Sequence, residues 1–382
     1  MKRIALVSGT RPEVVKLAPI YLYATQQCSE RPVWISTGQH ADMAGEMERA
    51  FGIAPDHNLS VMAKDQSLAT LSARLIERSY AIFNETLPEI VVVQGDTTTV
   101  LCAALAAFYL KIPVAHVEAG LRTYDLSSPW PEEGNRRLVA QIATWHFCPT
   151  ETSRRNLLSE SINAEQCFVT GNTSIDALLY MHAKTSSRVD SYLGGLQASG
   201  IPQDIFLGEC GSEPKPFIMI TMHRRESFGS GFEEICDAIV RLANRYPDIR
   251  FLYPVHLNPG VRDVVFRRLM GLANVVLVEP LSYVQFIILM ARCLLVMTDS
   301  GGIQEEAPSL GKPVIVLREK TERPEGVEVG ASILCGTSAE KIFQEVSRLV
   351  DSPAEYRRHV VSANPYGDGQ AAQRILNVLR EL

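Results

Sequence analysis

The sequence lacks several features that would each define a class of protein. Its eight cysteines are scattered without a Cys-x-x-Cys pair, and several lie in apolar runs, which predicts reduced cysteines in the core. Positive charge is not in excess, since the net charge is −6, so a nucleic-acid partner is not expected. No apolar run reaches the length of a membrane span, and the apolar part of the N-terminus is too short for a signal peptide. We therefore expect a cytoplasmic protein without a membrane segment.

Common catalytic and cofactor motifs are missing as well. Neither a P-loop nor a dinucleotide fingerprint follows the first expected strand, which disfavours ATP hydrolysis by that motif and chemistry with NAD. No His-Glu-x-x-His motif or Cys/His cluster with metal-ligand spacing indicates zinc, and no Gly-x-Ser-x-Gly elbow indicates acyl transfer. The sequence therefore predicts no metal and no cofactor.

Short apolar runs alternate with amphipathic stretches along the 382 residues, a length that exceeds one usual core. With 46% hydrophobic and 21% charged residues, this pattern predicts parallel sheets covered by helices on both faces. The expected strands cover residues 4–7, 33–36, 90–93, 114–117, 217–221, 251–255, 275–278, 294–297 and 314–317. The alternation weakens between Thr185 and Pro216, so we expect a domain boundary there or slightly before. The predicted fold class is α/β, with two doubly wound (Rossmann-like) domains and a cleft between them.

The segment 294–317 has the order strand, small-residue turn, short helix and strand, with Ser300-Gly301-Gly302 at the turn. Glycines let an anion approach the backbone, and the helix N-terminus carries partial positive charge. Glu306, one turn into the helix, is placed to hold ribose hydroxyls. The segment predicts a phosphorylated, ribose-bearing ligand, although Ser-Gly-Gly is also ordinary in loops that bind nothing.

Charged side chains follow other expected strands, at the sheet edge where ligands bind in such folds. Arg11 and Lys16 follow the first strand, where they either face the ligand or are solvated surface charges. His223-Arg224-Arg225-Glu226 follows the strand 217–221, and such a cation cluster suits a diphosphate. His223 is thus a candidate phosphate ligand or proton donor.

Three carboxylates are candidates for acid–base chemistry. Asp96 and Glu118 follow the neighbouring strands 90–93 and 114–117, and Glu132 lies in the proline-framed loop 128–133. Carboxylates gathered in a half-buried cleft repel one another, which raises at least one pKa toward neutrality and suits proton transfer. The alternative is that Asp96 and Glu132 cap helices and that Glu118 pairs with Arg122.

Taken in order, these motifs resemble those of the bacterial non-hydrolysing UDP-N-acetylglucosamine 2-epimerases, over essentially the whole chain. The matching segments are residues 9–13, 95–99, 116–123, 128–133, 170–173, 223–226, 299–313, 321–325 and 364–367. The resemblance implies the fold of the B-type glycosyltransferases, with UDP held mainly by the second domain. It assigns residues 1–173 and a returning C-terminal helix, 366–382, to the first domain and residues 174–365 to the second.

The resemblance also implies a role for each candidate residue. Asp96, Glu118 and Glu132 would perform the chemistry with His223, which would also contact the UDP phosphates. The residues that would bind substrate are Arg11, Lys16, Phe286, Ser300, Gly301, Gly302, Glu306 and Arg323. A homodimer is expected on the same basis.

The reaction of the family inverts C2 of UDP-GlcNAc to give UDP-ManNAc, the product that feeds surface-polysaccharide synthesis. A C2 hydrogen beside no carbonyl is not acidic, so the anomeric C–O bond breaks first, UDP leaves, and a glycal remains. A proton must then return to the opposite face while UDP adds back, which requires groups on both faces. No nicotinamide or metal is needed.

The chain departs from the family at two places. The usual Gln-His-Arg, followed by Glu or Gln and Met, is here Gln39-His40-Ala41-Asp42-Met43, and Leu281 replaces a usual Gln. Many bacterial members bind a second UDP-GlcNAc as an activator near the first segment, which leaves that regulation open here. Recognition of the uracil base would depend on backbone groups and Phe286.

The sequence also distinguishes between alternative functions. A glycosyltransferase of the same fold is disfavoured by the carboxylate trio, which also argues against a nucleotide-sugar sensor without catalysis. A hydrolysing epimerase, which releases ManNAc and UDP, is disfavoured by the complete segments 128–133 and 321–325. An epimerase of a modified UDP-sugar remains an alternative.

Overall fold

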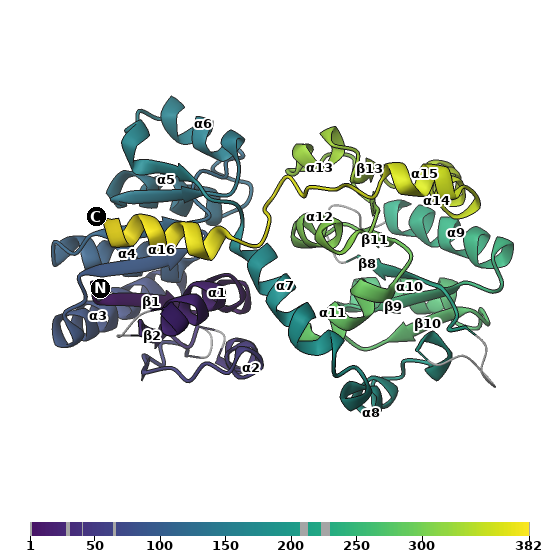
Figure 1. Ribbon diagram of the computed structural model, residues 1–382, viewed down its shortest axis with the longest axis horizontal. Coiled ribbons are helices and arrows are strands. Elements are labelled where there is room, and N and C mark those ends of the chain that lie inside the picture. Colours follow the sequence, from purple (N-terminus) through teal and green to yellow (C-terminus); the bar gives the residue numbers. More distant parts are fainter. Residues whose placement is uncertain are drawn as a thin grey trace. The chain divides into compact units, whose positions relative to one another are not determined.

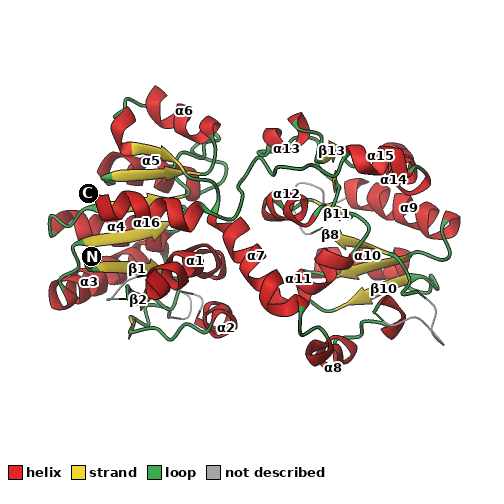
Figure 2. Cartoon of the chain, in the orientation of Figure 1, coloured by secondary structure: helices red, strands yellow, loops and turns green. Residues whose placement is uncertain are grey.

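The computed structural model describes residues 2–27, 31–39, 41–63, 66–206, 213–222 and 230–381. They form two compact units, one made of Met1–Tyr180 with Tyr366–Leu382 and the other of Met181–Pro365 (Figure 1). The sequence pattern predicted the boundary between Thr185 and Pro216 or slightly before, and the resemblance placed it after residue 173. The two units divide after Tyr180, within helix α7 (Thr173–Ser186). Each unit contains one parallel sheet covered by helices, which confirms the predicted α/β fold class of two doubly wound domains (Figure 2).

The first unit is built on a seven-stranded parallel sheet with strand order β3-β2-β1-β4-β5-β6-β7. Its strands are β1 (Ile4–Ser8), β2 (Val33–Ser36), β3 (His57–Asn58), β4 (Ile90–Gln94), β5 (Val114–Val117), β6 (Trp145–Cys148) and β7 (Cys167–Val169). Its helices are α1 (Arg11–Gln27), α2 (Ala41–Phe51), α3 (Leu68–Thr86), α4 (Thr98–Tyr109), α5 (Glu132–Ile142), α6 (Glu151–Ser159), the short η1 (Ala164–Gln166), α7 and α16 (Ala371–Glu381). Strands β1 and β4 are buried along their whole length, because helices cover both faces of the sheet.

The C-terminal helix α16 belongs to the first unit, where it packs against α1 (Figure 1). Asp176 on α7 caps its N-terminus by accepting hydrogen bonds from the backbone N–H groups of Ala371 (3.3 Å) and Ala372 (2.8 Å). Burial raises the pKa of Asp176 to about 6. The backbone N–H of Asn172 also donates to the carbonyl oxygen of Tyr366 at 2.7 Å, so the returning chain is fixed at two places.

The second unit is built on a six-stranded parallel sheet with strand order β10-β9-β8-β11-β12-β13. Its strands are β8 (Phe217–Thr221), β9 (Arg250–Pro254), β10 (Val275–Val278), β11 (Val296–Thr298), β12 (Val314–Val316) and β13 (Ser332–Leu334). Its helices are α8 (Asp190–Ala198), η2 (Gln203–Ile205), α9 (Ser230–Arg245), α10 (Pro259–Leu269), α11 (Tyr283–Arg292), α12 (Gly301–Glu306), η5 (Ala307–Leu310), α13 (Pro324–Glu328), α14 (Ala339–Asp351) and α15 (Pro353–Arg358).

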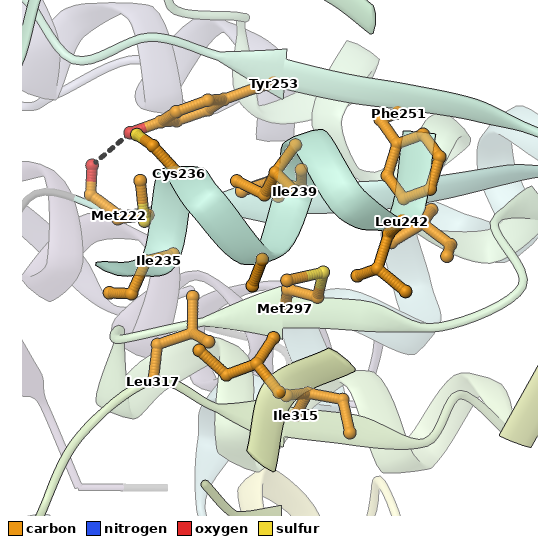
Figure 3. Packing of buried hydrophobic residues seen from close by; sticks show 14 of the residues in the cluster. Met222, Ile235, Cys236, Ile239, Leu242, Phe251, Tyr253, Met297, Ile315 and Leu317 are labelled. Atoms are coloured by element: carbon orange, nitrogen blue, oxygen red, sulfur yellow. Dashed lines mark hydrogen bonds between the residues drawn. The ribbon is translucent and has the colours of Figure 1, made fainter. Parts of the chain in front are cut away.

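The core of the second unit forms where α9 packs on the sheet (Figure 3). Apolar residues recur on α9 at helical spacing, as in Ile235, Ile239 and Leu242, and all three are buried. The hydroxyl of Tyr253 on β9 donates to the carbonyl oxygen of Met222 at 3.1 Å, which satisfies a polar group inside this apolar layer (Figure 3).

Two further expectations concern the composition. The six cysteines in the described ranges are buried and form no disulfide, which agrees with the expectation of reduced core cysteines. Among the same residues, no helix combines the length and apolar character that crossing a membrane requires.

Candidate active site

The topology of the first sheet shows where a ligand site is expected. Strands β1 and β4 are neighbours from which the chain winds in opposite directions, which makes the space beyond their carboxyl ends the topological switch point. The loop after β1 leads into Arg11, and the loop after β4 contains Gly95, Asp96 and Thr97. Candidate residues from distant segments thus meet at one edge of this sheet.

Glu118, directly after β5, is held by polar side chains that include Lys16, Asn172 and Gln94. Its Oε1 atom lies 2.5 Å from Nζ of Lys16 and 3.2 Å from Nδ2 of Asn172, and Gln94 donates to Oε2. The backbone of Glu118 has φ 61°, a left-handed conformation that is uncommon for a residue with a side chain and is concentrated at functional sites. The position of this carboxylate is therefore fixed by its surroundings.

Asp96 is held in a similar way. Nε and Nη2 of Arg136 lie 2.9 and 2.8 Å from Oδ2 of Asp96, and Asn135 donates to its carbonyl oxygen at 2.8 Å. The preceding residue, Gly95, has φ 85°, and a Cβ atom placed on it would lie 3.8 Å from Oε2 of Glu118. Glycine therefore suits this position because of its left-handed backbone conformation, and the distance shows that the Asp96 loop lies beside the Glu118 carboxylate.

Glu132 is the first residue of α5 and is half-buried. Its carboxylate makes no hydrogen bond or ion pair with any other described residue. The next residue, Glu133, is buried and accepts hydrogen bonds from the backbone N–H groups of Thr123 and Tyr124 at 3.1 and 3.2 Å. Glu133 thereby fixes the preceding loop, whereas Glu132 is available to a ligand.

The alternative of helix caps and a Glu118–Arg122 pair is wrong. Thr97, not Asp96, caps α4, and the N-cap of α5 is Pro131. Arg122 instead pairs with Glu160, with Nε 2.7 Å from Oε1. Lys16 and Arg136 each bring a positive charge to one of the carboxylates, Glu118 and Asp96 respectively, which offsets the mutual repulsion that the sequence predicted.

The remaining cation predicted here, Arg11, is half-buried at the first position of α1 and forms no ion pair with the described residues. Lys16 lies one turn further along the same helix and pairs with Glu118, so its interpretation as a solvated surface charge is wrong.

The second sheet has its switch point between β8 and β11. The segment after β8, including the candidate His223, lies outside the described residues. After β11, the N-cap residue Ser300 makes no side-chain cap bond, and helix α12 begins at Gly301, so the two glycines expected in the turn before the helix form its first two residues. The backbone N–H of Ser300 donates to Oγ1 of Thr298 at 3.0 Å, which orients the turn.

Arg323 lies against the start of α12. A Cβ atom placed on Gly301 would lie 3.4 Å from Nη2 of Arg323, and Nε of Arg323 forms an ion pair with the buried Glu305. The backbone N–H of Arg323 also donates to Oγ1 of Thr321 at 3.0 Å. A fixed guanidinium beside glycine backbone at a helix start is an arrangement suited to a phosphate.

The other two candidates of this unit lie nearby in the fold. Glu306 is the last residue of α12 and is half-buried. Phe286, also half-buried, is on α11, which packs against η5 directly after α12. Leu281, at the position of the usual Gln, is buried between β10 and α11.

Comparisons with known proteins show the family of this chain. The sequence model of the family described as UDP-N-acetylglucosamine 2-epimerase matches residues 25–380. The UDP-N-acetylglucosamine 2-epimerase of Escherichia coli (strain K12) is 48% identical over 379 residues, which cover 99% of this chain and 98% of that relative. The chain belongs to the UDP-N-acetylglucosamine 2-epimerase family. It is therefore an isomerase, and the predicted family is confirmed.

Solved structures resemble this epimerase over its whole length. The UDP-GlcNAc 2-epimerase of Neisseria meningitidis, crystallised bound to UDP-GlcNAc, has 42% identity and a TM-score of 0.88, with both chains covered completely. The enzyme of Methanocaldococcus jannaschii, crystallised in complex with UDP-GlcNAc and UDP, has 32% identity and a TM-score of 0.79, again with both chains covered completely.

Sequence reasoning missed several residues that hold the epimerase's carboxylates, among them Gln94, Arg136 and Asn172. It also passed over Glu13, which is buried and whose pKa is raised by that burial to about 7. The available signal was that Glu13 and Asn172 lie in segments that match the family. No group of His, Cys, Asp and Glu side chains suited to a metal ion occurs in the part of the chain that the structure describes.

Proposed function

We propose that this epimerase interconverts UDP-GlcNAc and UDP-ManNAc by inversion at C2, without release of free ManNAc. The observation that carries the proposal is the pair of carboxylates, Asp96 and Glu118, held by separate cations after neighbouring strands. The relative with 48% identity is named UDP-N-acetylglucosamine 2-epimerase, and the Neisseria meningitidis enzyme was crystallised with UDP-GlcNAc.

In the proposed reaction the anomeric C–O bond breaks first and UDP departs. The positive charge that develops on the sugar makes the C2 proton removable, which gives a glycal. One of Asp96, Glu118 and Glu132 acts as the base, and another returns a proton to the opposite face before UDP adds back. The fixed positions of Asp96 and Glu118 suit this task, because proton transfer requires the carboxylate within hydrogen-bond reach of C2.

The leaving diphosphate needs charge stabilisation throughout. We assign this role to His223, to the Ser300-Gly301-Gly302 turn and to Arg323, whose guanidinium lies against Gly301. Glu306 is assigned to the ribose hydroxyls and Phe286 to the base. Arg11 and Lys16 are assigned to the sugar, and Lys16 also holds Glu118.

A homodimer is also part of the proposal, together with action in the cytoplasm and a role in supplying surface-polysaccharide synthesis. Large apolar side chains are exposed on two helices that pack side by side: Tyr80 on α3, and Phe108 and Tyr109 at the end of α4. Such a surface favours association. A wild-type protein that sediments as a monomer at micromolar concentration would contradict the homodimer.

The product assignment separates the proposed reaction from its alternatives. ³¹P and ¹H NMR of the purified protein with UDP-GlcNAc should show UDP-ManNAc and an equilibrium that is also reached from UDP-ManNAc. Free ManNAc with UDP would instead identify a hydrolysing epimerase. Turnover only of a UDP-sugar with altered substituents would identify the modified-substrate alternative.

A further inference from the structure

The carboxylate of Glu13 connects the two loops that flank the switch point of the first sheet. Its Oε2 atom accepts hydrogen bonds from the backbone N–H groups of Gly9 (2.6 Å) and Thr10 (2.7 Å), in the loop after β1. Its Oε1 atom accepts the hydroxyl hydrogen of Thr97, in the loop after β4. One side chain thus joins the segment before Arg11 to the residue that follows Asp96.

The hydrogen bonds of Glu13 to the loop after β1 are those of an ordinary helix start. A Glu at the third position of a helix commonly accepts the N–H of the N-cap residue, and Glu13 does so for Thr10 at the start of α1. The bond to Thr97 goes beyond a cap, since Thr97 is 84 residues away and itself caps α4 by accepting from the N–H of Val100. Only this second bond involves the Asp96 loop.

The surroundings leave the two loops little room to move. A Cβ atom on Gly9 would overlap the hydroxyl groups of Thr37 and Thr99. Glu13 is 1% exposed and forms no ion pair with any described residue. Burying a carboxyl group without a cation is unfavourable unless hydrogen bonds compensate, and here three donors converge on it.

We propose that Glu13 is a positioning residue of the epimerase, which sets the location of the Asp96 carboxylate through Thr97. This inference rests on the proposed function, in which Asp96 takes part in proton transfer at C2. Arg136 and Asn135 hold Asp96 from the α5 side, and Glu13 with Thr97 holds the same loop from the α1 side. Loss of the hydrogen bond between Thr97 and Glu13 lets the Asp96 loop shift. A shift of about 1 Å at a reacting group can cost about 100-fold in rate.

The test is a double-mutant cycle with Glu13→Ala and Thr97→Val, measured as kcat and KM for UDP-GlcNAc. We expect each single variant to lower kcat about 10- to 100-fold while KM changes less than about threefold. The double variant should be no slower than the slower single variant, because both changes break the same connection. Glu13→Gln and Thr97→Ser, which preserve hydrogen bonding across the two loops, should keep kcat within about threefold of wild type.

Thr150→Val is the matched control. Thr150 caps α6 in the same unit by accepting from the N–H of Ser153, so its replacement removes a threonine cap but touches neither loop. It should lower the melting temperature about as much as Thr97→Val and leave kcat unchanged. If Glu13→Ala does not fold, the comparison of Thr97→Val with Thr150→Val decides by itself.

Three outcomes would overturn the inference: equal kcat for Thr97→Val and Thr150→Val, additive losses in the cycle, or an effect confined to KM. A wild-type protein that forms UDP-ManNAc in this assay while the variants match it overturns the inference alone. A wild-type protein that does not turn over UDP-GlcNAc overturns the proposed function and, with it, the positioning role.

Discussion

The ammonium group of Lys16 lies 2.5 Å from Oε1 of Glu118, although 102 residues separate the two in the sequence. Lys16 is on the second turn of α1, and Glu118 follows β5 in a left-handed backbone conformation. The side chain and the backbone of Glu118 are therefore both constrained, as expected for a group that must meet one atom of a substrate.

Replacement of Lys16 by Met should remove the cation that fixes Glu118. We expect kcat to fall at least about tenfold, because a charge-assisted hydrogen bond and its orientation are lost. Steady-state kinetics with UDP-GlcNAc measure the effect. The control, Lys111→Met, changes an exposed lysine of the same unit, and equal activity of the two variants would contradict a role for Lys16.

Asp96→Asn should lower kcat about 100- to 10,000-fold, because the amide cannot exchange the proton while the shape of the side chain is preserved. Asp56→Asn is a matched control, since Asp56 also binds an arginine, Arg31, with both oxygens but lies outside the candidate site. A rate near that of wild type for Asp96→Asn would remove Asp96 from the chemistry.

Arg323→Met should act mainly on substrate binding. We expect KM for UDP-GlcNAc to rise about tenfold or more, since a charged hydrogen bond to phosphate contributes about 1.5–3 kcal/mol. As a control, Arg262→Met breaks a more exposed Arg–Glu pair, with Glu279, elsewhere in the second unit. If both variants have the KM of wild type, Arg323 does not contact the diphosphate.

The pKa of Glu13 predicts a pH dependence of stability. Because burial raises this pKa from 4.5 to about 7, the folded state binds the proton more tightly than the unfolded state. The resulting contribution of Glu13 to the free energy of unfolding is present in full below pH 4.5 and is lost as the pH rises through 7. Glu13→Gln cannot ionise, so its unfolding free energy relative to wild type should increase by about 3 kcal/mol between pH 4.5 and 7.

Urea unfolding at a series of pH values measures this difference. The control is Glu77→Gln, which replaces an exposed glutamate on α3. The unfolding free energy of Glu13→Gln relative to wild type could also stay constant or fall as the pH rises. Either result would show that the pKa of Glu13 is not raised in the folded protein.

The strands that the sequence predicted are those with continuous aliphatic runs, such as β1 and β4. Four short strands were missed: β3, β6, β7 and β13. Strand β6 has the sequence Trp145-His146-Phe147-Cys148, and β3 contains only two residues, so neither has an aliphatic run that sequence patterns detect. These strands form because a neighbouring strand supplies their hydrogen bonds, which is a tertiary effect.

The same limit applies to the site. Asp96, Glu118 and the Ser300-Gly301-Gly302 segment at the start of α12 were predictable because each lies just after an apolar run. Their partners were not, because the pairs Lys16–Glu118 and Arg136–Asp96 join segments far apart in the sequence. Glu13 was passed over for a related reason, since a first-turn glutamate is ordinary in sequence and its connection to Thr97 exists only in the folded chain.

The most direct test of the proposed mechanism is deuterium incorporation at C2. Purified protein is incubated with UDP-GlcNAc in D₂O, and both epimers are followed by ¹H NMR and mass spectrometry. If the C2–H bond is cleaved and C2 is reprotonated from solvent, UDP-ManNAc should carry one deuterium at C2. UDP-GlcNAc that forms in the reverse reaction should carry one there as well. UDP-ManNAc that forms with its C2 hydrogen retained would contradict proton exchange at C2 and, with it, the assigned roles of Asp96 and Glu118.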